Sequence, residues 1–398
     1  MARRFIFSRP RRAALLRPTL LSTVLLDELV TGFPVVGLPL LRDYLGLSYE
    51  QVGLLFTVEA LSAMILYPII NLLSDRKSKR WWVIGGLMGM AFAFALMGSV
   101  RNFGFLLLAF ALYAPAGGAA VGLSEATLID AAPQEGTQTM TRWTLVSSVG
   151  DLLSPLTVAA MAALHFGWSV LCWLAVALWL GTALILWFQR FPHPAVAAGA
   201  TDSAPAPSIW TSLREALRDP VLLRWAALTT IPAMVDEVFL GFAALYLRDV
   251  LHVSQAMIGL ILALQMMGVL LGLFALDLLI KRRTVAPQRL LRWLALLALV
   301  GMIGLLTIRS TWLAALALFV IGLGVAGWYP IAKAEAYARL PGRSGMVRAV
   351  TDLGRPFEVA LPGIVGLVAG RFGVLAGVGL LGLAPVLILL LVPWRTKR

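Results

Sequence analysis

The sequence has few charged residues, one cysteine and three histidines. Charged side chains make up 13% of its 398 residues, whereas a soluble domain usually has about 25%. The composition therefore excludes an ordinary soluble protein. The single Cys172 allows no intramolecular disulfide, the histidines form no metal cluster or catalytic triad, and no phosphate-binding loop is present. We expect no metal site, no cofactor and no enzymatic activity.

Long apolar runs dominate the chain instead. Hydrophobic residues make up 60% of it, and the mean hydropathy is +0.87. Runs of about 20 apolar residues can cross a bilayer as helices, and the alternating pattern of barrel strands is absent. We therefore predict an all-helical integral membrane protein. Its twelve spans are expected at about 18–41, 50–73, 81–100, 104–130, 142–165, 168–188, 222–247, 254–280, 290–308, 311–338, 346–369 and 372–393.

The net charge of +13 is unevenly distributed. Most of the 33 Lys and Arg residues lie in the two termini and in the even-numbered loops, such as 76–80 and 281–283. Loops rich in Lys and Arg stay in the cytoplasm. We therefore predict a multi-pass protein of the plasma (inner) membrane with both termini cytoplasmic, and no binding of nucleic acid.

The first half of the chain recurs in the second half. Leu-Asp-Glu-Leu at 26–29 returns as Val-Asp-Glu-Val at 235–238, and Leu-Arg-Asp at 41–43 returns as Leu-Arg-Asp at 247–249. The offset is 209 residues at the first motif and 206 at the second. A repeat of about half the chain indicates a duplicated bundle.

Six spans return the chain to the side on which it began, so the two bundles are parallel repeats. The predicted domains are an N-terminal six-helix bundle at 1–190, a cytoplasmic linker at 191–221 and a C-terminal six-helix bundle at 222–398. The linker is rich in alanine and proline and ends in a short amphipathic segment. We expect that segment to lie at the cytoplasmic membrane surface.

Charged residues inside the predicted spans are the candidate site. Spans 3, 6 and 12 contain none, and span 9 contains only Arg292 near its start. At a helix centre each would cost about 2.5–3.5 kcal/mol against lipid, so we expect them to line a polar interior. The candidates for substrate binding or proton coupling, including one amide, are Asp27, Glu28, Glu59, Glu125, Asp151, Asp236, Glu237, Gln265, Lys333, Glu335, Arg355 and Glu358.

Asp27 and Glu28 are successive residues, about 100° apart on a helix. One is expected to face the cavity and the other a neighbouring helix. Thr23, Asp27 and Thr31 form a polar stripe, which favours Asp27 for the cavity. A purely structural role for these acids is the alternative. The repeat places Gln265 opposite Glu59, which suggests that the two halves have different roles.

The basic residues in the spans have two interpretations each. Asp352, Arg355 and Glu358 are spaced to form an ion triplet on span 11, unless Arg355 binds a substrate anion. Glu335 can pair with Arg339 four residues on. Lys333 has no such acidic neighbour, so it is expected to seek an acid in the other half or a substrate.

In its twelve spans, its repeat and its cytoplasmic linker, the chain resembles the major facilitator superfamily over nearly its whole length. The loop at 71–80 reads Asn-Leu-Leu-Ser-Asp-Arg-Lys-Ser-Lys-Arg and is similar to that family's signature G-x-L-A-D-R-x-G-R-K/R, with Asn71 and Ser78 in place of glycines. The resemblance implies a cytoplasmic gate in which the basic residues pair with an acid at the end of span 4. The gate candidates are Asp75, Arg76, Lys79, Arg80, Asp130 and, at the start of span 5, Arg142.

Span 5 contains Gly-Asp-Leu-Leu-Ser-Pro-Leu at 150–156. It resembles a diverged antiporter signature G-x-x-x-G-P-x-G-G, with Ser154 replacing a glycine. The resemblance is to the drug/metabolite:proton antiporter branch. It implies a monomeric transporter in the lipid bilayer, working by alternating access and driven by a proton gradient, that exports a small amphipathic or cationic molecule. The alternative is a proton-coupled symporter that imports a polar or anionic metabolite, with Lys333 and Arg355 holding its carboxylate or phosphate.

Overall fold

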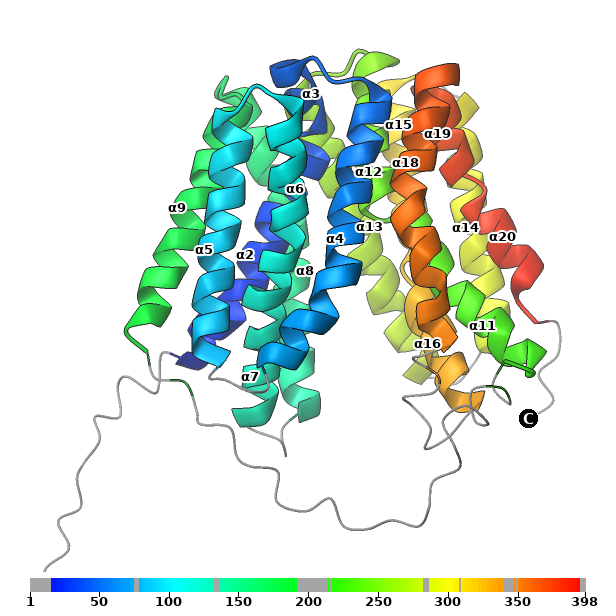
Figure 1. Cartoon of the computed structure of the whole chain (residues 1–398). Coiled ribbons are helices and arrows are strands. Elements are labelled where there is room, and N and C mark those ends of the chain that lie inside the picture. Colours follow the sequence, from blue (N-terminus) through cyan, green and yellow to red (C-terminus); the bar gives the residue numbers. More distant parts are fainter. Residues whose placement is uncertain are drawn as a thin grey trace, which may run out of the picture. The chain divides into compact units, whose positions relative to one another are not determined.

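The structure is a computed structural model that describes residues 16–74, 79–131, 136–189, 191, 214, 217–281, 286–307, 309–339, 347 and 350–393. Within these ranges every regular element is helical, and twelve segments are long and apolar enough to cross a membrane (Figure 1). The predicted fold class is thereby confirmed. The amphipathic segment predicted in the linker falls almost wholly outside the described residues.

The chain packs into two compact units. Unit 1 comprises 1–33, 58–154 and 166–198, and unit 2 comprises 34–57, 155–165 and 199–398. Two segments of the first repeat, 34–57 and 155–165, thus pack in the same unit as the second repeat. The units therefore do not follow the halves of the duplication, and the division of domains at the linker stays a prediction.

Unit 1 is built from long helices packed side by side. Two of its outer helices, α5 and α9, pack along each other, and the Trp168 indole of α9 donates to the Met97 carbonyl of α5 at 2.9 Å. The helices with residues in this unit are α2 (Leu16–Val36), α4 (Tyr49–Ser74), α5 (Lys79–Ser99), α6 (Phe103–Gly117), α7 (Leu123–Ala131), α8 (Gly136–Ala163) and α9 (Trp168–Trp187).

A π-helical turn, η1 (Gly118–Gly122), interrupts the span that begins with α6. Pro115 lies just before it and has no N–H to donate to the preceding turn. The irregular segment passes close to α5, because a Cβ on Gly86 would lie 2.5 Å from the backbone nitrogen of Ala120. Glycine at this position allows the two backbones to meet.

Unit 2 holds the helices of the second repeat together with α3 (Leu38–Leu45). Within it α15 packs against α13 and α14, and the buried Tyr246 hydroxyl donates to the Leu305 carbonyl at 2.9 Å. The remaining elements are α11 (Pro220–Thr230), η3 (Ile231–Val235), α12 (Glu237–Asp249), α13 (Gln255–Lys281), α14 (Pro287–Thr307), α15 (Thr311–Val325), α16 (Trp328–Arg339), η4 (Asp352–Gly354), α18 (Arg355–Phe372), α19 (Val374–Leu381) and α20 (Ala384–Leu391).

The seventh span is broken where its counterpart in the first repeat is continuous. The 3-10 turn η3 separates α11 from α12, whereas α2 runs unbroken through the equivalent positions. The repeat places Pro232 of η3 opposite Thr23 of α2. Proline cannot donate to the helix and clashes with the preceding turn, so the two copies of the Asp-Glu motif are folded differently.

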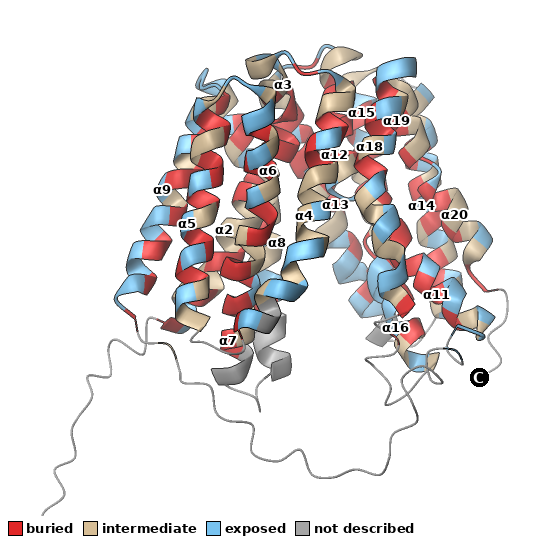
Figure 2. Ribbon diagram, viewed as in Figure 1, coloured by how far each residue is buried: buried red, intermediate tan, exposed pale blue. Residues whose placement is uncertain are grey.

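Exposed residues occur along the helices of both units (Figure 2), and many of them have large apolar side chains. Trp173, for example, is 52% exposed and Trp312 73% exposed. A monomeric soluble protein rarely exposes so much apolar surface, whereas lipid solvates it at no cost. Together with the twelve spans, this surface identifies a multi-pass membrane protein.

Candidate functional site

Asp27 and Glu28 on α2 face different partners. The Glu28 carboxylate accepts a hydrogen bond from the Ser147 hydroxyl of α8 at 2.8 Å. The Asp27 carboxylate accepts from Thr31, one turn further along α2, at 3.5 Å. Glu28 thus contacts a neighbouring helix and Asp27 does not share that contact, which is the division of roles that the 100° helical spacing predicts.

Glu59 of α4 lies close enough to Asp27 for the two carboxyl groups to interact electrostatically. Tyr113 of α6 lies beside these acids, because its hydroxyl group and that of Thr31 form a hydrogen bond. We call Asp27, Glu28 and Glu59 the acid cluster. All three acids are half-buried, and helices α2, α4, α6 and α8 of unit 1 position them.

Glycines let α2 and α8 approach each other beside the acid cluster. A Cβ on Gly150 would lie 2.5 Å from the Leu25 carbonyl and 2.8 Å from the Glu28 Cβ. On the next turn of α8, Ser154 is buried against Gly32 of α2. The span-5 motif that pointed to this region therefore has a packing role. Asp151 follows Gly150 on α8 and is half-buried.

Two further candidates of the first repeat lie apart from the acid cluster. Glu125 is half-buried on α7, twelve residues after Tyr113, which is roughly 18 Å along a helix. Arg142 is exposed near the start of α8. Their roles in binding or gating stay predictions.

In the second repeat, Asp236 and Glu237 are exposed at a helix start rather than inside a helix. Asp236 is the N-cap position of α12 and Glu237 lies in its first turn. A carboxylate there is favoured by the helix dipole, an effect that their first-repeat counterparts inside α2 do not have. The break at η3 is the reason, and the repeat alone did not reveal it.

Gln265, which the repeat places opposite Glu59, is 1% exposed on α13. Its side-chain carbonyl oxygen has no hydrogen-bond partner among the described residues. A buried acceptor without a donor costs about 1–3 kcal/mol. Such an atom is a candidate acceptor for a substrate or water in unit 2.

One pair of the predicted triplet on span 11 is present among the described ion pairs. The Arg355 guanidinium lies 3.2 Å from the Asp352 carboxylate, and Glu358 lies within electrostatic range of both groups. Arg355 is therefore neutralised by neighbours on its own chain segment. Whether Arg355 has only this structural role or also binds a substrate anion stays a prediction.

Lys333 has a local partner that the sequence analysis missed. Its ammonium donates to the Tyr329 hydroxyl at 2.7 Å and lies 4.7 Å from the centre of the Tyr329 ring. Tyr329 precedes it by one helical turn, so an aromatic residue takes the place of the expected acid. The prediction that Lys333 binds an acid of the other half or a substrate stays a prediction.

Glu335 and Arg339 also pair differently from the prediction. Glu335 accepts from the Gln288 side chain at 3.4 Å, whereas Arg339 pairs with Asp219 at 3.0 Å. Asp219 also caps α11 by accepting from the backbone of Leu222. Although burial alone raises its pKa, the hydrogen bonds from Arg339 and from this backbone outweigh that effect and hold the pKa of Asp219 below its usual value.

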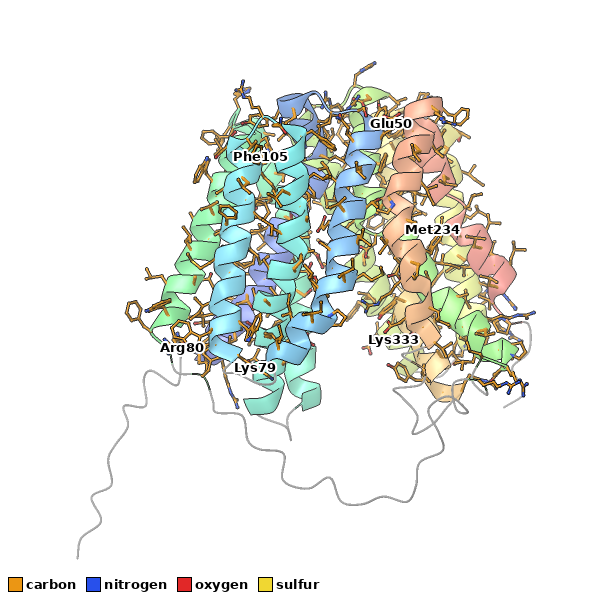
Figure 3. The ribbon with its side chains drawn as sticks, in the orientation of Figure 1. Glu50, Lys79, Arg80, Phe105, Met234 and Lys333 are labelled. Atoms are coloured by element: carbon orange, nitrogen blue, oxygen red, sulfur yellow. The ribbon has the colours of Figure 1, made fainter. Side chains whose placement is uncertain are left out.

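The predicted cytoplasmic gate is described only in part. Asp75, Arg76 and the side chain of Asp130 lie outside the described residues. Lys79 and Arg80 begin α5 (Figure 3). The Arg80 guanidinium donates to the Trp187 carbonyl at the end of α9 and lies 5.1 Å from the Trp81 ring. The pairing of the gate stays a prediction.

Unit 2 contains a second polar site that the sequence analysis did not assign. The Leu-Arg-Asp motif occurs at the end of α3 and again at the end of α12, and each arginine pairs with the aspartate of the other copy. We call Arg42–Asp249 and Arg248–Asp43 the crossed ion pairs. The repeated motif was the signal for them, since a duplicated Arg-Asp dipeptide can pair with its own copy.

Further contacts surround the crossed ion pairs. The Tyr49 hydroxyl donates to Asp249 at 2.6 Å, and the Arg42 guanidinium lies 4.2 Å from the Tyr49 ring. Arg248 also donates to the Pro39 carbonyl at 2.6 Å. The ends of α3, α4 and α12 are thereby tied together within unit 2.

Comparisons with known proteins agree with this fold. The family model described as Major Facilitator Superfamily matches residues 20–356. A bacterial homologue of the human lysosomal transporter Spinster, solved in an inward-facing and occupied conformation, superposes with a TM-score of 0.78 at 17% identity, covering 96% of this chain and 97% of that chain. The nucleoside transporter NupG gives 0.72 at 14% identity, covering 96% and 100%. A comparison with curated proteins finds no match.

Proposed function

The chain belongs to the major facilitator superfamily, and from this premise we propose that it exports a small amphipathic or cationic molecule in exchange for protons. The family and the fold shared with two transporters identify the protein as a membrane transporter and not an enzyme. At 14–17% identity the shared fold does not carry over either transporter's substrate.

The observation that carries the proposal is the acid cluster of unit 1. Two carboxyl groups, Asp27 and Glu59, lie within electrostatic range of each other in spans that otherwise contain mainly apolar residues. A charged residue inside a membrane span marks an ion or substrate pathway. In the proposed exchange, a proton and a cationic substrate compete for these carboxylates, so binding of one releases the other.

The other contacts of the cluster give its members different tasks. Glu28 is held by Ser147 on α8, which favours an anchoring role. The one hydrogen bond described for the Asp27 carboxylate is the bond from Thr31, which at 3.5 Å is longer than the bond that holds Glu28. Because the Thr31 hydroxyl is itself bonded to Tyr113, movement of α6 would be transmitted to Asp27.

The crossed ion pairs fit a transporter in which the two repeats move against each other. In alternating access, one repeat rocks against the other around a central site. Contacts that join the ends of the repeats must then form and break once in each cycle. We propose that Arg42–Asp249 and Arg248–Asp43 are such contacts, since each pairs a residue of one repeat with a residue of the other.

The importer remains the alternative function. It requires Lys333 and Arg355 to hold an anionic substrate. Arg355 is paired with Asp352, and Lys333 with Tyr329, so both cations have partners within their own helix or turn. These contacts favour the exporter.

Everted membrane vesicles test the proposal. Respiration acidifies their interior, a fluorescent weak base reports the pH gradient, and a panel of lipophilic cations that includes ethidium and tetraphenylphosphonium is added. Proton-coupled export predicts dequenching on addition of a transported cation, with no dequenching in Asp27→Asn. Equal dequenching in both proteins would refute a coupling role for Asp27, and dequenching by an anionic metabolite alone would favour the importer.

Localisation and orientation belong to the same proposal. Twelve spans make the protein a multi-pass membrane protein. The concentration of Lys and Arg in the termini and even-numbered loops supports cytoplasmic termini in the plasma membrane. We also propose that the protein functions as a monomer.

A further inference from the structure

A groove on the surface of unit 1 lies outside the acid cluster. It is formed by α5 together with the end of α4 and the segment from α6 to η1, and it has a volume of about 350 Å³. Trp81 and Phe92 are each 56% exposed on its wall. The residues that matter for its shape are Ile70, Trp81, Gly85, Phe92, Leu112 and Ala119.

The groove exists because α5 lacks a side chain at Gly85. A Cβ built there would meet no heavy atom within 4 Å. One residue further, Gly86 packs directly on the junction of α6 and η1, where an added Cβ would lie 2.5 Å from the Ala120 nitrogen and 2.6 Å from the Ala116 carbonyl. The floor of the groove is therefore fixed by close helix packing, while the space above Gly85 stays open.

The length of the groove matches one leaflet of a bilayer. Trp81 and Phe92 are eleven residues apart on α5, which is roughly 16 Å along a helix. The hydrocarbon core of a bilayer is about 30 Å thick, so the groove extends across about half of it. Trp81 lies at the end of this stretch, and tryptophan favours the interface between lipid and water.

Basic residues stand at the same end of the groove. Lys79 and Arg80 directly precede Trp81 at the start of α5 (Figure 3). The Arg80 guanidinium is held there by the Trp187 carbonyl and lies against the Trp81 ring. The groove thus combines an apolar channel of one leaflet's depth with positive charge at the depth of the lipid headgroups.

We propose that this groove binds one anionic phospholipid. An acyl chain lies along α5 over Gly85, between Trp81 and Phe92. The phosphate of the headgroup lies beside Lys79 and Arg80. Anionic lipids are concentrated in the cytoplasmic leaflet, on which side the predicted topology places the start of α5.

Native mass spectrometry of the purified full-length protein tests the proposal. The protein is titrated with phosphatidylglycerol and, separately, with phosphatidylcholine of the same acyl chains. Each basic residue near a membrane surface favours anionic lipid roughly 5-fold. We therefore expect one phosphatidylglycerol to bind the wild type on the order of 25-fold more tightly than phosphatidylcholine. Lys79→Gln should reduce that preference roughly 5-fold.

Filling the groove tests the acyl-chain part independently. Gly85→Leu places a side chain in the open space and improves helix propensity, so the fold should persist. It should lower phosphatidylglycerol binding about tenfold. The matched control is Gly181→Leu on α9, where an added Cβ also meets nothing within 4 Å, and binding should be unchanged. Wild-type binding by a folded Gly85→Leu protein, or equal binding of both lipids to the wild type, would overturn the proposal.

Discussion

Removing the Arg42 charge should open the end of unit 2 that the crossed ion pairs hold together. The two pairs differ in exposure, because the side chains of Arg42 and Asp249 are 24% and 20% exposed whereas that of Asp43 is 60% exposed. A hydrogen bond to a charged group in a partly buried place contributes about 1.5–3 kcal/mol. An exposed ion pair contributes about 0.2–1 kcal/mol. Arg42–Asp249 should therefore dominate.

The assay is the rate at which a water-soluble thiol reagent modifies a cysteine at position 36. Val36 is 4% exposed, and its carbonyl accepts from Gln255 at 3.0 Å, so modification requires opening. Cys172, the only natural cysteine, is first replaced by alanine. Arg42→Gln should then raise the rate about 10- to 150-fold, and Asp43→Asn at most about 5-fold.

A double-mutant cycle isolates the Arg42–Asp249 interaction from the other contacts of each residue. Arg42 also donates to the Leu47 carbonyl, and Asp249 also accepts from Tyr49. Combining Arg42→Gln with Asp249→Asn should cost less than the sum of the single changes, with a coupling energy of about 1.5–3 kcal/mol. Strict additivity, or equal effects of Arg42→Gln and Asp43→Asn, would refute the reasoning.

Two further predictions concern packing and pH. Gly150→Ala should destabilise the protein by about 1–3 kcal/mol, because the new methyl group overlaps the Leu25 carbonyl, and it should lower the midpoint of thermal unfolding while Gly181→Ala does not. Because the pKa of Asp219 is lowered in the folded protein, its pairing with Arg339 stabilises the fold above the unfolded pKa of about 3.9 and is lost as the pH falls through the folded value. The difference in midpoint between wild type and Arg339→Gln should therefore shrink between about pH 7 and pH 3, and a constant difference would contradict this assignment.

The spans could be predicted because lipid imposes a simple rule on the sequence. A segment of about 20 apolar residues has few alternatives to a membrane helix, and among the described residues a helix that is long and apolar enough to cross a membrane overlaps each of the twelve predicted segments. That Asp27 and Glu28 contact different partners followed from the helical spacing, whereas the cavity-facing role of Asp27 stays a prediction. Local geometry and solvent were sufficient for these inferences.

The asymmetry of the two repeats could not be predicted from the repeat itself. Matching motifs suggested that Asp236 would lie inside a helix as Asp27 does. One proline at position 232 breaks the second copy, and the acids become the start of α12. Pro232, which the repeat places opposite Thr23, is the signal for this break, since proline is the strongest interrupter of a helix.

Side-chain pairing was the least predictable feature. Arg339 could have paired with Glu335 on its own helix, but Asp219 at the start of α11 is within 3.0 Å. Choices of this kind depend on how neighbouring helices pack, and spacing along one helix does not contain that information. The crossed ion pairs were missed for the same reason, although their repeated motif was visible.

The most direct test of the central claim measures how pH affects substrate binding by the acid cluster. Binding of a transported lipophilic cation to the purified protein is followed from about pH 8 to pH 5. If a proton and the substrate compete for Asp27 and Glu59, affinity should fall as the pH falls, by up to roughly tenfold per pH unit. The Asp27→Asn/Glu59→Gln protein should show little pH dependence, whereas Asp277→Asn, at an exposed acid of α13, should behave as the wild type. An unchanged pH dependence in the double variant would contradict the account.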